Sequence, residues 1–167
     1  SINLSNIDII SSVKSVIDYF EDIICSKEIQ LEFINDMDKN IVACDEEKLQ
    51  RIVFNLIHNS IKYTNKNDKI IVSTKKKDNK VYISVEDTGI GVPSNELRKI
   101  FNKFFQGSFS KSNMDGGMGV GLFIVNKFVK FLDGKIYVYS KPNKGTKIMI
   151  ELPFFLVEKP TKKLVAI

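Results

Sequence analysis

The clearest pattern of hydrophobic and polar positions lies between residues 45 and 65. Apolar residues recur there at the spacing of one buried helical face, at Leu49, Ile52, Val53, Leu56, Ile57 and Ile61. Asp45 precedes this stripe and is expected to cap the helix, with Glu46 and Glu47 in the first turn, where the helix dipole favours negative charge. A polar cluster at 65–68 is expected to end the helix.

Weaker patterns predict the remaining elements. Helical spacing recurs over residues 10–24, with Asn6 as a candidate cap, and over 122–132, where Gly134 closes the helix. A shorter helix is expected at 95–100. Apolar runs bounded by turn residues predict strands at 30–34, 41–43, 69–75, 80–87, 135–140 and 146–152. Helices in one layer and a mixed or antiparallel sheet in the other give an α+β fold.

The composition fits one soluble globular domain. The chain has 167 residues, of which 43% are hydrophobic and 27% charged, and these fractions exclude an intrinsically disordered protein. No apolar run approaches the roughly 18 residues of a membrane-spanning helix, and no segment resembles a signal peptide. Cys25 and Cys44 lack metal-binding spacing, so we expect reduced thiols in a cytoplasmic protein.

The net charge of +5, from 25 basic and 20 acidic residues, is compatible with an anionic partner. Arg51 and Arg98 are the only arginines, so almost all basic residues are lysines, and bidentate reading of nucleic-acid bases is not favoured. Charge alone therefore does not decide between a nucleic acid, an anionic small ligand and a lysine-rich composition without functional meaning.

Polar residues on the helix after Asp45 suggest a binding site. Asn55 and Asn59 lie one turn apart, and Lys62 and Tyr63 follow after a further turn. An amide oxygen suits Mg²⁺, which usually keeps water and phosphate oxygens as its other ligands. Lys62 could neutralise phosphate, and Tyr63 could lie against a base. The alternative is an ordinary solvated helix face.

A carboxylate, Asp87, ends a predicted strand and is followed by Gly89 and Gly91, whose backbone can approach a planar ligand closely. A carboxylate accepts a hydrogen bond from the exocyclic amine of adenine but would face the carbonyl oxygen of guanine, so this acid would select adenine. Two other interpretations compete with this one. Asp-Thr-Gly also marks aspartic proteases, and a plain turn would explain each glycine separately.

A second glycine cluster, at Gly117, Gly119 and Gly121, directly precedes the helix expected at 122–132. Free N–H groups at a helix N-terminus bind phosphate. The cluster is not a dinucleotide fingerprint, because a polar loop rather than a strand precedes it. It is not a Walker P-loop either, because no Gly-Lys-Ser/Thr follows at the required spacing.

The order of these motifs resembles the catalytic, ATP-binding domain of bacterial sensor histidine kinases. The motifs are similar to that family's asparagine box (Asn59 with Lys62-Tyr63), first glycine box (Asp87-x-Gly89-x-Gly91), phenylalanine box (Phe101-x-x-Phe104-Phe105), second glycine box (Gly117-x-Gly119-x-Gly121-Leu122) and final Gly145-Thr146. The resemblance spans residues 1–152 and leaves 153–167 as a tail. It implies the Bergerat fold of gyrase, chaperone and mismatch-repair ATPases, a two-layer α/β sandwich. In that fold a mixed sheet of about five strands packs on three helices, and a mobile lid covers ATP.

The resemblance also implies roles for the residues of the asparagine and first glycine boxes. Asn59 would ligate Mg²⁺, and Asn55 and Lys62 would lie at the phosphates of ATP. Tyr63 would flank the adenine, and Asp87 would accept a hydrogen bond from its amine.

Further roles follow for the downstream motifs. Thr146 would support the base through water, the glycines and Leu122 would line the nucleotide, and residues 107–118 would form the lid. Family members often carry arginine in the phenylalanine box and just after it, where this chain has Lys103 and Gln106. Lys103 is therefore the candidate contact to the γ-phosphate, as a point charge rather than a bidentate fork.

Asn55 and the single histidine bear on the reaction type. In the ATPases and serine kinases of the superfamily a glutamate stands at the position of Asn55 and activates the nucleophile. An amide cannot act as a base, which favours transfer to a histidine over hydrolysis. The only histidine of this chain, His58, lacks the acidic, Pro-containing surroundings of a phospho-acceptor, and we interpret it as structural.

We therefore expect the protein-histidine kinase domain of a bacterial two-component sensor. It would transfer the γ-phosphoryl group of Mg-ATP to a histidine on a separate dimerisation domain and so signal to a response regulator. The alternatives are an ATP-binding regulatory module without transfer activity and a gyrase-type ATPase, which Asn55 disfavours. No nucleic-acid partner is needed, because the expected ligand is a polyphosphate. Without dimerisation helices we expect a monomer, and a membrane anchor of the parent kinase would lie outside this chain.

Overall fold

The computed structural model describes residues 1–106 and 119–158 of the chain. Its main sheet has the strand order β2-β4-β5-β7-β6; β2 and β4 are parallel, and the other neighbours are antiparallel. The five strands are β2 (Gln30–Asp36), β4 (Lys69–Lys77), β5 (Lys80–Asp87), β6 (Lys135–Lys141) and β7 (Gly145–Pro153). A separate two-stranded sheet pairs β1 (Ser5–Asp8) with β3 (Ile41–Cys44). The mixed five-stranded sheet confirms the expected fold class.

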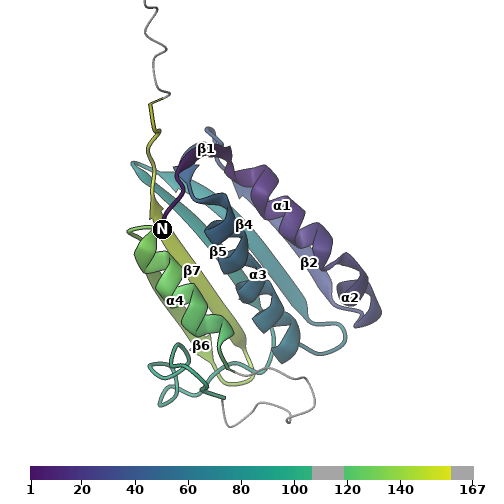
Figure 1. Ribbon diagram of the computed structural model, residues 1–167. Helices are drawn as coiled ribbons and strands as arrows, with labels where there is room; N and C mark the ends of the chain where they lie inside the picture. The colour runs from purple at the N-terminus through teal and green to yellow at the C-terminus, as the bar shows by residue number, and fades with distance from the viewer. Residues whose placement is uncertain (107–118, 159–167) are drawn as a thin grey trace, which may run out of the picture.

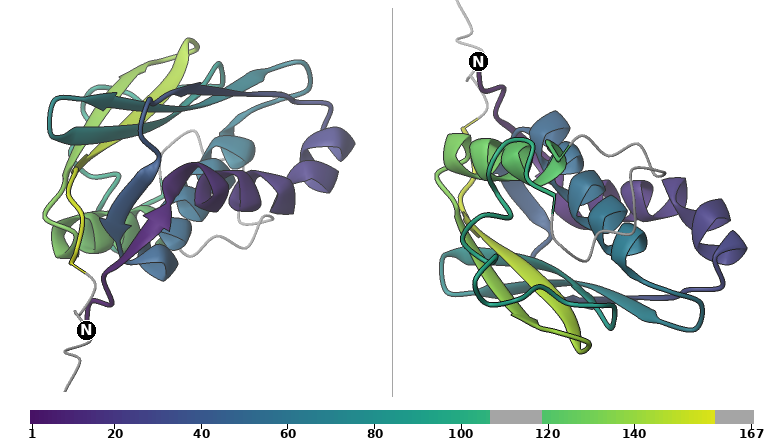
Figure 2. Two further views of the ribbon diagram at one scale, coloured as in Figure 1. Left: turned by 90° about the horizontal axis from the view of Figure 1, so that it is seen from above. Right: turned by 90° about the horizontal axis from the view of Figure 1, so that it is seen from below.

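Helices cover one face of the main sheet (Figure 1). In the helical layer α3 (Glu46–Tyr63) lies between α1 (Ile9–Tyr19) and α4 (Gly121–Phe131), and α2 (Glu21–Ser26) follows α1 after a break. Figure 2 shows the two layers edge-on, with the main sheet on one side and the helices on the other. The protein is therefore a two-layer sandwich, as expected.

The hydrophobic core fills the space between the two layers. The stripe expected from the sequence is buried along its whole length, and its members are Leu49, Ile52, Val53, Leu56, Ile57 and Ile61. Across the core lie the inward residues of the three central strands, among them Ile70, Val72, Val81, Ile83, Val85 and Ile150. Burial of this aliphatic surface is the main favourable contribution to folding, and it fixes α3 against β5.

The N-terminal segment differs from the prediction. Asn6 lies in β1 and does not cap α1. The cap is Asp8, whose carboxylate accepts hydrogen bonds from the backbone N–H groups of Ile10 and Ser11. The Asn6 side chain instead bonds to both the N–H and the C=O of Val157, each at 2.9 Å. It thereby ties the segment after β7 to the N-terminal strand.

Two other helix predictions were wrong in detail. The helical spacing over 10–24 is correct, but the helix breaks at Phe20 into α1 and α2. Residues 95–100 form successive turns rather than a helix, in which the N–H of Glu96 bonds to the C=O of Pro93 and the N–H of Lys99 bonds to the C=O of Glu96. Within 95–100 only Ile100 is buried, so little packing supports a regular helix.

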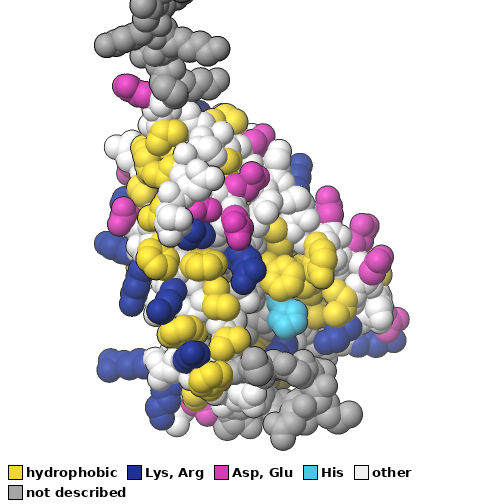
Figure 3. Space-filling view, viewed as in Figure 1, with side chains coloured by type: hydrophobic (Ala, Val, Ile, Leu, Met, Phe, Trp, Pro, Cys, Tyr) yellow, Lys and Arg dark blue, Asp and Glu magenta, His cyan; other side chains and the backbone are white. Residues whose placement is uncertain are grey.

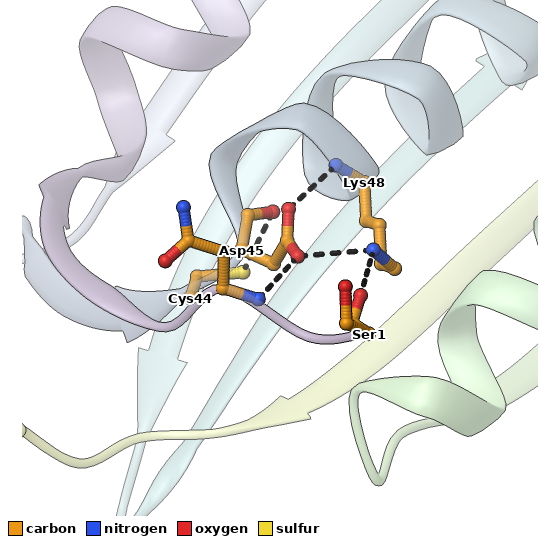
Figure 4. A network of polar contacts seen from close by, with 5 residues as sticks. Ser1, Cys44, Asp45 and Lys48 are labelled. Carbon is orange, nitrogen blue, oxygen red and sulfur yellow. Dashed lines mark hydrogen bonds and ion pairs between the residues drawn. The ribbon is translucent and has the colours of Figure 1, made fainter.

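Asp45 begins α3 as predicted, and it also holds the start of the chain (Figure 4). Its carboxylate accepts hydrogen bonds from the backbone N–H groups of Lys48 (3.2 Å) and Asn3 (2.8 Å) and pairs with the Lys48 ammonium at 3.0 Å. That ammonium also donates to the C=O of Ser1 at 2.8 Å. Burial opposes ionisation of Asp45, but these contacts outweigh burial and lower its pKa. Next to it, burial raises the pKa of the Cys44 thiol to about 11, so Cys44 stays protonated.

Replacing Asp45 should therefore destabilise the domain. We expect Asp45→Ala to lower the free energy of unfolding by about 1 kcal/mol, the usual effect of losing a helix cap, and the Tm by roughly 2–4 °C. Because the folded pKa of Asp45 is lowered, its contribution is complete above the ordinary pKa of 3.8 and disappears as the pH falls through the folded value. Denaturant titrations of parent and variant at about pH 7 and about pH 2 measure both effects.

The matched control is Asp38→Ala, because Asp38 is exposed in the loop between β2 and β3. It should leave the free energy of unfolding unchanged at both pH values. A stability difference between Asp45→Ala and the parent that persists unchanged at about pH 2 would contradict the assignment.

Candidate functional site

One cavity of about 260 Å³ lies between α3, the end of β5 and the start of α4. The residues that α3 contributes to its wall are Phe54, Asn55, His58, Asn59, Lys62 and Tyr63. The end of β5 and the segment after it contribute Asp87, Ile90, Gly91, Val92, Pro93, Glu96 and Ile100. The other lining residues are Phe105, Gly119, Val120, Gly121, Leu122 and Ile124, at and before the start of α4, and Thr146 and Ile148 of β7.

Most of the site residues expected from the sequence line this cavity. They are Asn55, Asn59, Lys62, Tyr63, Asp87, Gly91, Gly119, Gly121, Leu122 and Thr146. Gly89 and Lys103 are not among the lining residues, and the Lys103 ammonium lies 5.0 Å from the ring centre of Phe104. Gly117 and the expected lid, 107–118, lie outside the described residues. The role of Lys103 at the γ-phosphate stays a prediction.

The asparagines of α3 share one face of the helix, as their spacing predicts. Asn55 donates from its amide nitrogen to the C=O of Arg51 at 2.7 Å, so its amide oxygen is left toward α4. A Cβ atom at Gly121 would lie 3.0 Å from that oxygen, so a side chain there would crowd it. Asn59 lies one turn further along, and its side chain hydrogen-bonds to no other described residue. Both amide oxygens are therefore available to a ligand or a metal ion.

Asp87 is the buried acceptor of the site, with only 5% of its surface exposed. One carboxylate oxygen accepts hydrogen bonds from the backbone N–H groups of Gly89 (3.0 Å) and Thr146 (3.3 Å), and the other accepts from the Ser60 hydroxyl (3.0 Å). Burial raises the pKa of Asp87, and these three hydrogen bonds oppose the rise. Because a carboxylate has about four acceptor positions, one remains for a donor on a ligand.

Glycine is required where the backbone closes around Asp87. Gly145 has φ +98°, a conformation that side chains disfavour, and a Cβ there would collide with the backbone C=O of Asp87. A Cβ at Gly89 would collide with the C=O of Tyr63. Gly89 is therefore needed for packing the end of β5 against the end of α3 rather than for lining the cavity.

The N-terminus of α4 forms the other end of the cavity. Its cap residue, Val120, provides no side-chain hydrogen bond, so the first N–H groups of the helix have no capping side chain. Such a terminus carries a partial positive charge and binds anions. Asn55, which faces this terminus, lies eight residues before Tyr63, or about 12 Å along α3. The cavity thus has a hydrogen-bond acceptor for an amine, the Asp87 carboxylate, at one end and an anion-binding site, the N-terminus of α4, at the other.

The two remaining predicted residues of α3 form the side wall. The Lys62 ammonium lies 5.5 Å from the ring centre of Tyr63. Burial, and secondly the carboxylate of Glu96, raises the pKa of Tyr63, so its ring stays neutral. A neutral aromatic ring with a nearby cation suits a planar base followed by phosphate.

Ser60 and Ser140 were not expected from the sequence. Ser60 occupies a position of the buried stripe of α3, and a polar residue there needs a partner, which is a signal that could have pointed to Asp87. Ser140, on β6, hydrogen-bonds to Thr146 and Val92. No pattern in the sequence around Ser140 indicated these contacts.

His58 is exposed and lines the cavity, and its interpretation as a structural residue stays a prediction. Its ring stacks on Phe54, with centres 6.0 Å apart and planes 7° apart. Phe54 in turn contacts Phe20 and Tyr19 of the α1 region. Figure 3 shows the histidine beside this apolar group on the helical face. The imidazole therefore belongs to the rim of the cavity.

Comparisons with known proteins find related sequences. The model of the family described as histidine kinase-, DNA gyrase B-, and HSP90-like ATPase matches residues 44–155. The sensor histidine kinase WalK of Bacillus subtilis is 32% identical over 152 residues, which are 89% of this chain and 24% of WalK. The histidine-protein kinase BarA of Escherichia coli is 32% identical over 148 residues, 83% of this chain and 16% of BarA. The chain thus spans at most about a quarter of the length of these two relatives.

Solved structures show the same fold. The nucleotide-free catalytic domain of the histidine kinase ThkA is 27% identical, with a TM-score of 0.80 over 91% of this chain and 96% of that domain. Full-length ShkA in complex with AMPPNP is 24% identical, with a TM-score of 0.82 over 97% of this chain and 33% of ShkA. Among the helices that the structure describes, none is long and apolar enough to cross a membrane.

Proposed function

Because the chain belongs to the family of histidine kinase-, DNA gyrase B- and HSP90-like ATPases, we propose that it binds Mg-ATP and transfers the γ-phosphoryl group to a histidine of another domain. One observation carries the proposal. A single cavity holds a buried carboxylate, Asp87, at one end and the uncapped N-terminus of α4, beside Asn55, at the other. That arrangement suits a nucleotide with an amino group on its base and a polyphosphate tail.

The adenine would lie at Asp87. The free acceptor position of this carboxylate takes one proton of the 6-amino group, and the Tyr63 ring flanks the base. A 6-oxo purine would place an oxygen against the carboxylate, which leaves both acceptors unpaired and costs about 1–3 kcal/mol. The buried site therefore favours adenine over guanine.

The phosphates would lie toward α4. The N–H groups of its first turn supply partial positive charge there, and the Lys62 ammonium adds positive charge to the same cavity. The amide oxygens of Asn55 and Asn59 fit Mg²⁺, which prefers oxygen ligands and tolerates few from the protein. When bound, Mg²⁺ would neutralise charge on the phosphates. Asn59, without another described hydrogen-bond partner, is the better candidate ligand.

Transfer to histidine fits the chemistry at Asn55. An amide does not accept a proton, so it cannot activate water as a carboxylate at this position would. Phosphoryl transfer depends mainly on positioning and charge neutralisation, and an imidazole is nucleophilic without a base. Relatives named sensor histidine kinases support transfer to histidine over hydrolysis.

A response regulator would then receive the phosphoryl group, and the structure of ThkA in complex with the response regulator protein TrrA supports that partner. The domain would work in the cytoplasm, where ATP is available.

Transfer can be measured directly. We expect the domain, mixed with radiolabelled ATP, Mg²⁺ and a separately purified histidine-bearing dimerisation domain, to place an acid-labile label on that domain. The acceptor comes from the polypeptide that carries this chain or, failing that, from WalK. Replacement of the acceptor histidine by glutamine should abolish the label. ATP binding by calorimetry without any label on either acceptor would refute the kinase activity and leave a binding module.

A further inference from the structure

The hydroxyl of Ser140, on β6, joins three parts of the cavity wall. It lies 2.8 Å from the backbone nitrogen of Val92, 3.0 Å from the C=O of Gly145 and 2.8 Å from the hydroxyl of Thr146. Val92 and Thr146 line the cavity, whereas Ser140 does not. Any effect of Ser140 on a ligand is therefore transmitted through these neighbours.

The protons of this network can be assigned by counting. A serine hydroxyl has one proton and two lone pairs. The N–H of Val92 donates to Ser140, and the C=O of Gly145 can only accept, so the Ser140 proton points to Gly145. The second lone pair of Ser140 then accepts the proton of Thr146. This arrangement gives each of the three donors, the Val92 N–H and the two hydroxyls, one acceptor.

The assignment determines what Thr146 offers to the cavity. With its proton engaged by Ser140, the Thr146 hydroxyl presents only lone pairs to a ligand. Its backbone N–H donates to Asp87 at 3.3 Å, so the two residues lie side by side. Asp87, with its carboxylate, and Thr146, with its oriented hydroxyl, therefore line the same end of the cavity. An amino group has two protons to donate to such a pair, directly or through a water molecule.

We propose that Ser140 is a positioning residue for purine selection, because it holds the Thr146 hydroxyl as an acceptor and so favours a 6-amino over a 6-oxo purine. The inference rests on the proposed binding of ATP. Without Ser140 the Thr146 hydroxyl is free to rotate and to donate its proton into the cavity. A 6-oxo purine would then find a donor that the parent domain withholds.

Affinities for ATP and for inosine triphosphate, its 6-oxo counterpart, test this role by calorimetry. The parent should prefer ATP. In Ser140→Ala we expect the preference for ATP over inosine triphosphate to fall about tenfold, mostly through weaker ATP binding, as for loss of one oriented hydrogen bond. Ser140→Thr keeps the hydroxyl and should restore the preference. In a Thr146→Val background, Ser140→Ala should no longer change the preference, because the hydroxyl that it orients is gone.

The ratio of the affinities for ATP and inosine triphosphate distinguishes a positioning role from a role in fold stability. A cavity that is merely loosened would bind both nucleotides more weakly by the same factor. Equal losses for the two nucleotides in Ser140→Ala, or a preference in Ser140→Thr as low as in Ser140→Ala, would overturn the proposal. Thr146→Val alone tests the same point even if Ser140→Ala folds poorly, because it removes the hydroxyl that Ser140 orients and should lower the preference for ATP by about the same factor. A parent that binds both nucleotides equally would overturn this inference only. A parent that binds neither would overturn the proposed function itself.

Discussion

Asp87→Asn should weaken ATP binding about 30-fold while the domain stays folded. The substitution removes the charge and turns one acceptor oxygen into an NH₂ donor, which faces the amino group of adenine. Loss of a hydrogen bond to a charged group costs about 2 kcal/mol, and that converts to about 30-fold in the dissociation constant. Calorimetric titration with ATP measures the loss.

The folded state should not suffer from this change. Burial raises the pKa of Asp87, so the folded domain binds the carboxyl proton more tightly than the unfolded chain does. Ionised Asp87 therefore costs stability, and the cost appears as the pH rises from the ordinary carboxyl pKa through the raised one. An asparagine carries no such cost and can still accept the hydrogen bond from Gly89. We expect the Tm of Asp87→Asn at neutral pH to equal or exceed that of the parent.

Glu86→Gln is the matched control for this prediction. Glu86 precedes Asp87 on β5 and is exposed, and its carboxylate forms a long ion pair with Lys147, at 4.0 Å. Its neutralisation changes the net charge as Asp87→Asn does and should leave ATP affinity intact. An Asp87→Asn domain that binds ATP as tightly as Glu86→Gln does would show that the base is held elsewhere.

Asn59→Ala should remove the Mg²⁺-dependent part of ATP binding. If Asn59 supplies the protein ligand, the variant should bind Mg-ATP at least about tenfold more weakly, an effect of the size seen when a contact to a charged group is lost. With a chelator present, variant and parent should bind ATP alike. The label transferred to the acceptor domain should fall with the metal-dependent affinity. Fold stability should hold, because the Asn59 side chain bonds to no other described residue.

The control for Asn59→Ala is Asn65→Ala, an exposed asparagine just after α3. It should change neither ATP affinity nor its dependence on Mg²⁺. If Asn59→Ala keeps the full dependence on Mg²⁺, the metal ligand lies at another residue, and Asn55 is then the next to test. Comparing the Mg²⁺ dependence of ATP binding in Asn59→Ala and Asn55→Ala thus shows which of the two asparagines, one helical turn apart, ligates the Mg²⁺ ion.

Local sequence was sufficient for α3 and for the residues that it presents. The cap at Asp45, the buried stripe and the shared face of Asn55, Asn59 and Lys62 all follow from the period of an α-helix. The β-hairpins were predictable for the same reason, because strand alternation and turn residues are also local. Where no such pattern existed, as at 95–100, the prediction failed: tertiary packing does not support a helix there.

Contacts between distant segments needed the tertiary structure. Asp87 and Thr146 are 59 residues apart and become neighbours only through the register of β5 with β7. Ser60 and Ser140 reach Asp87 and Thr146 because α3 packs on β5 and because β6 pairs with β7. The sequence by itself determined which side chains share a helix face or end a strand, since those relations depend on backbone period alone. Only the tertiary structure decided which of these faces and strand ends meet, because strand register and core packing act between residues that no local pattern connects.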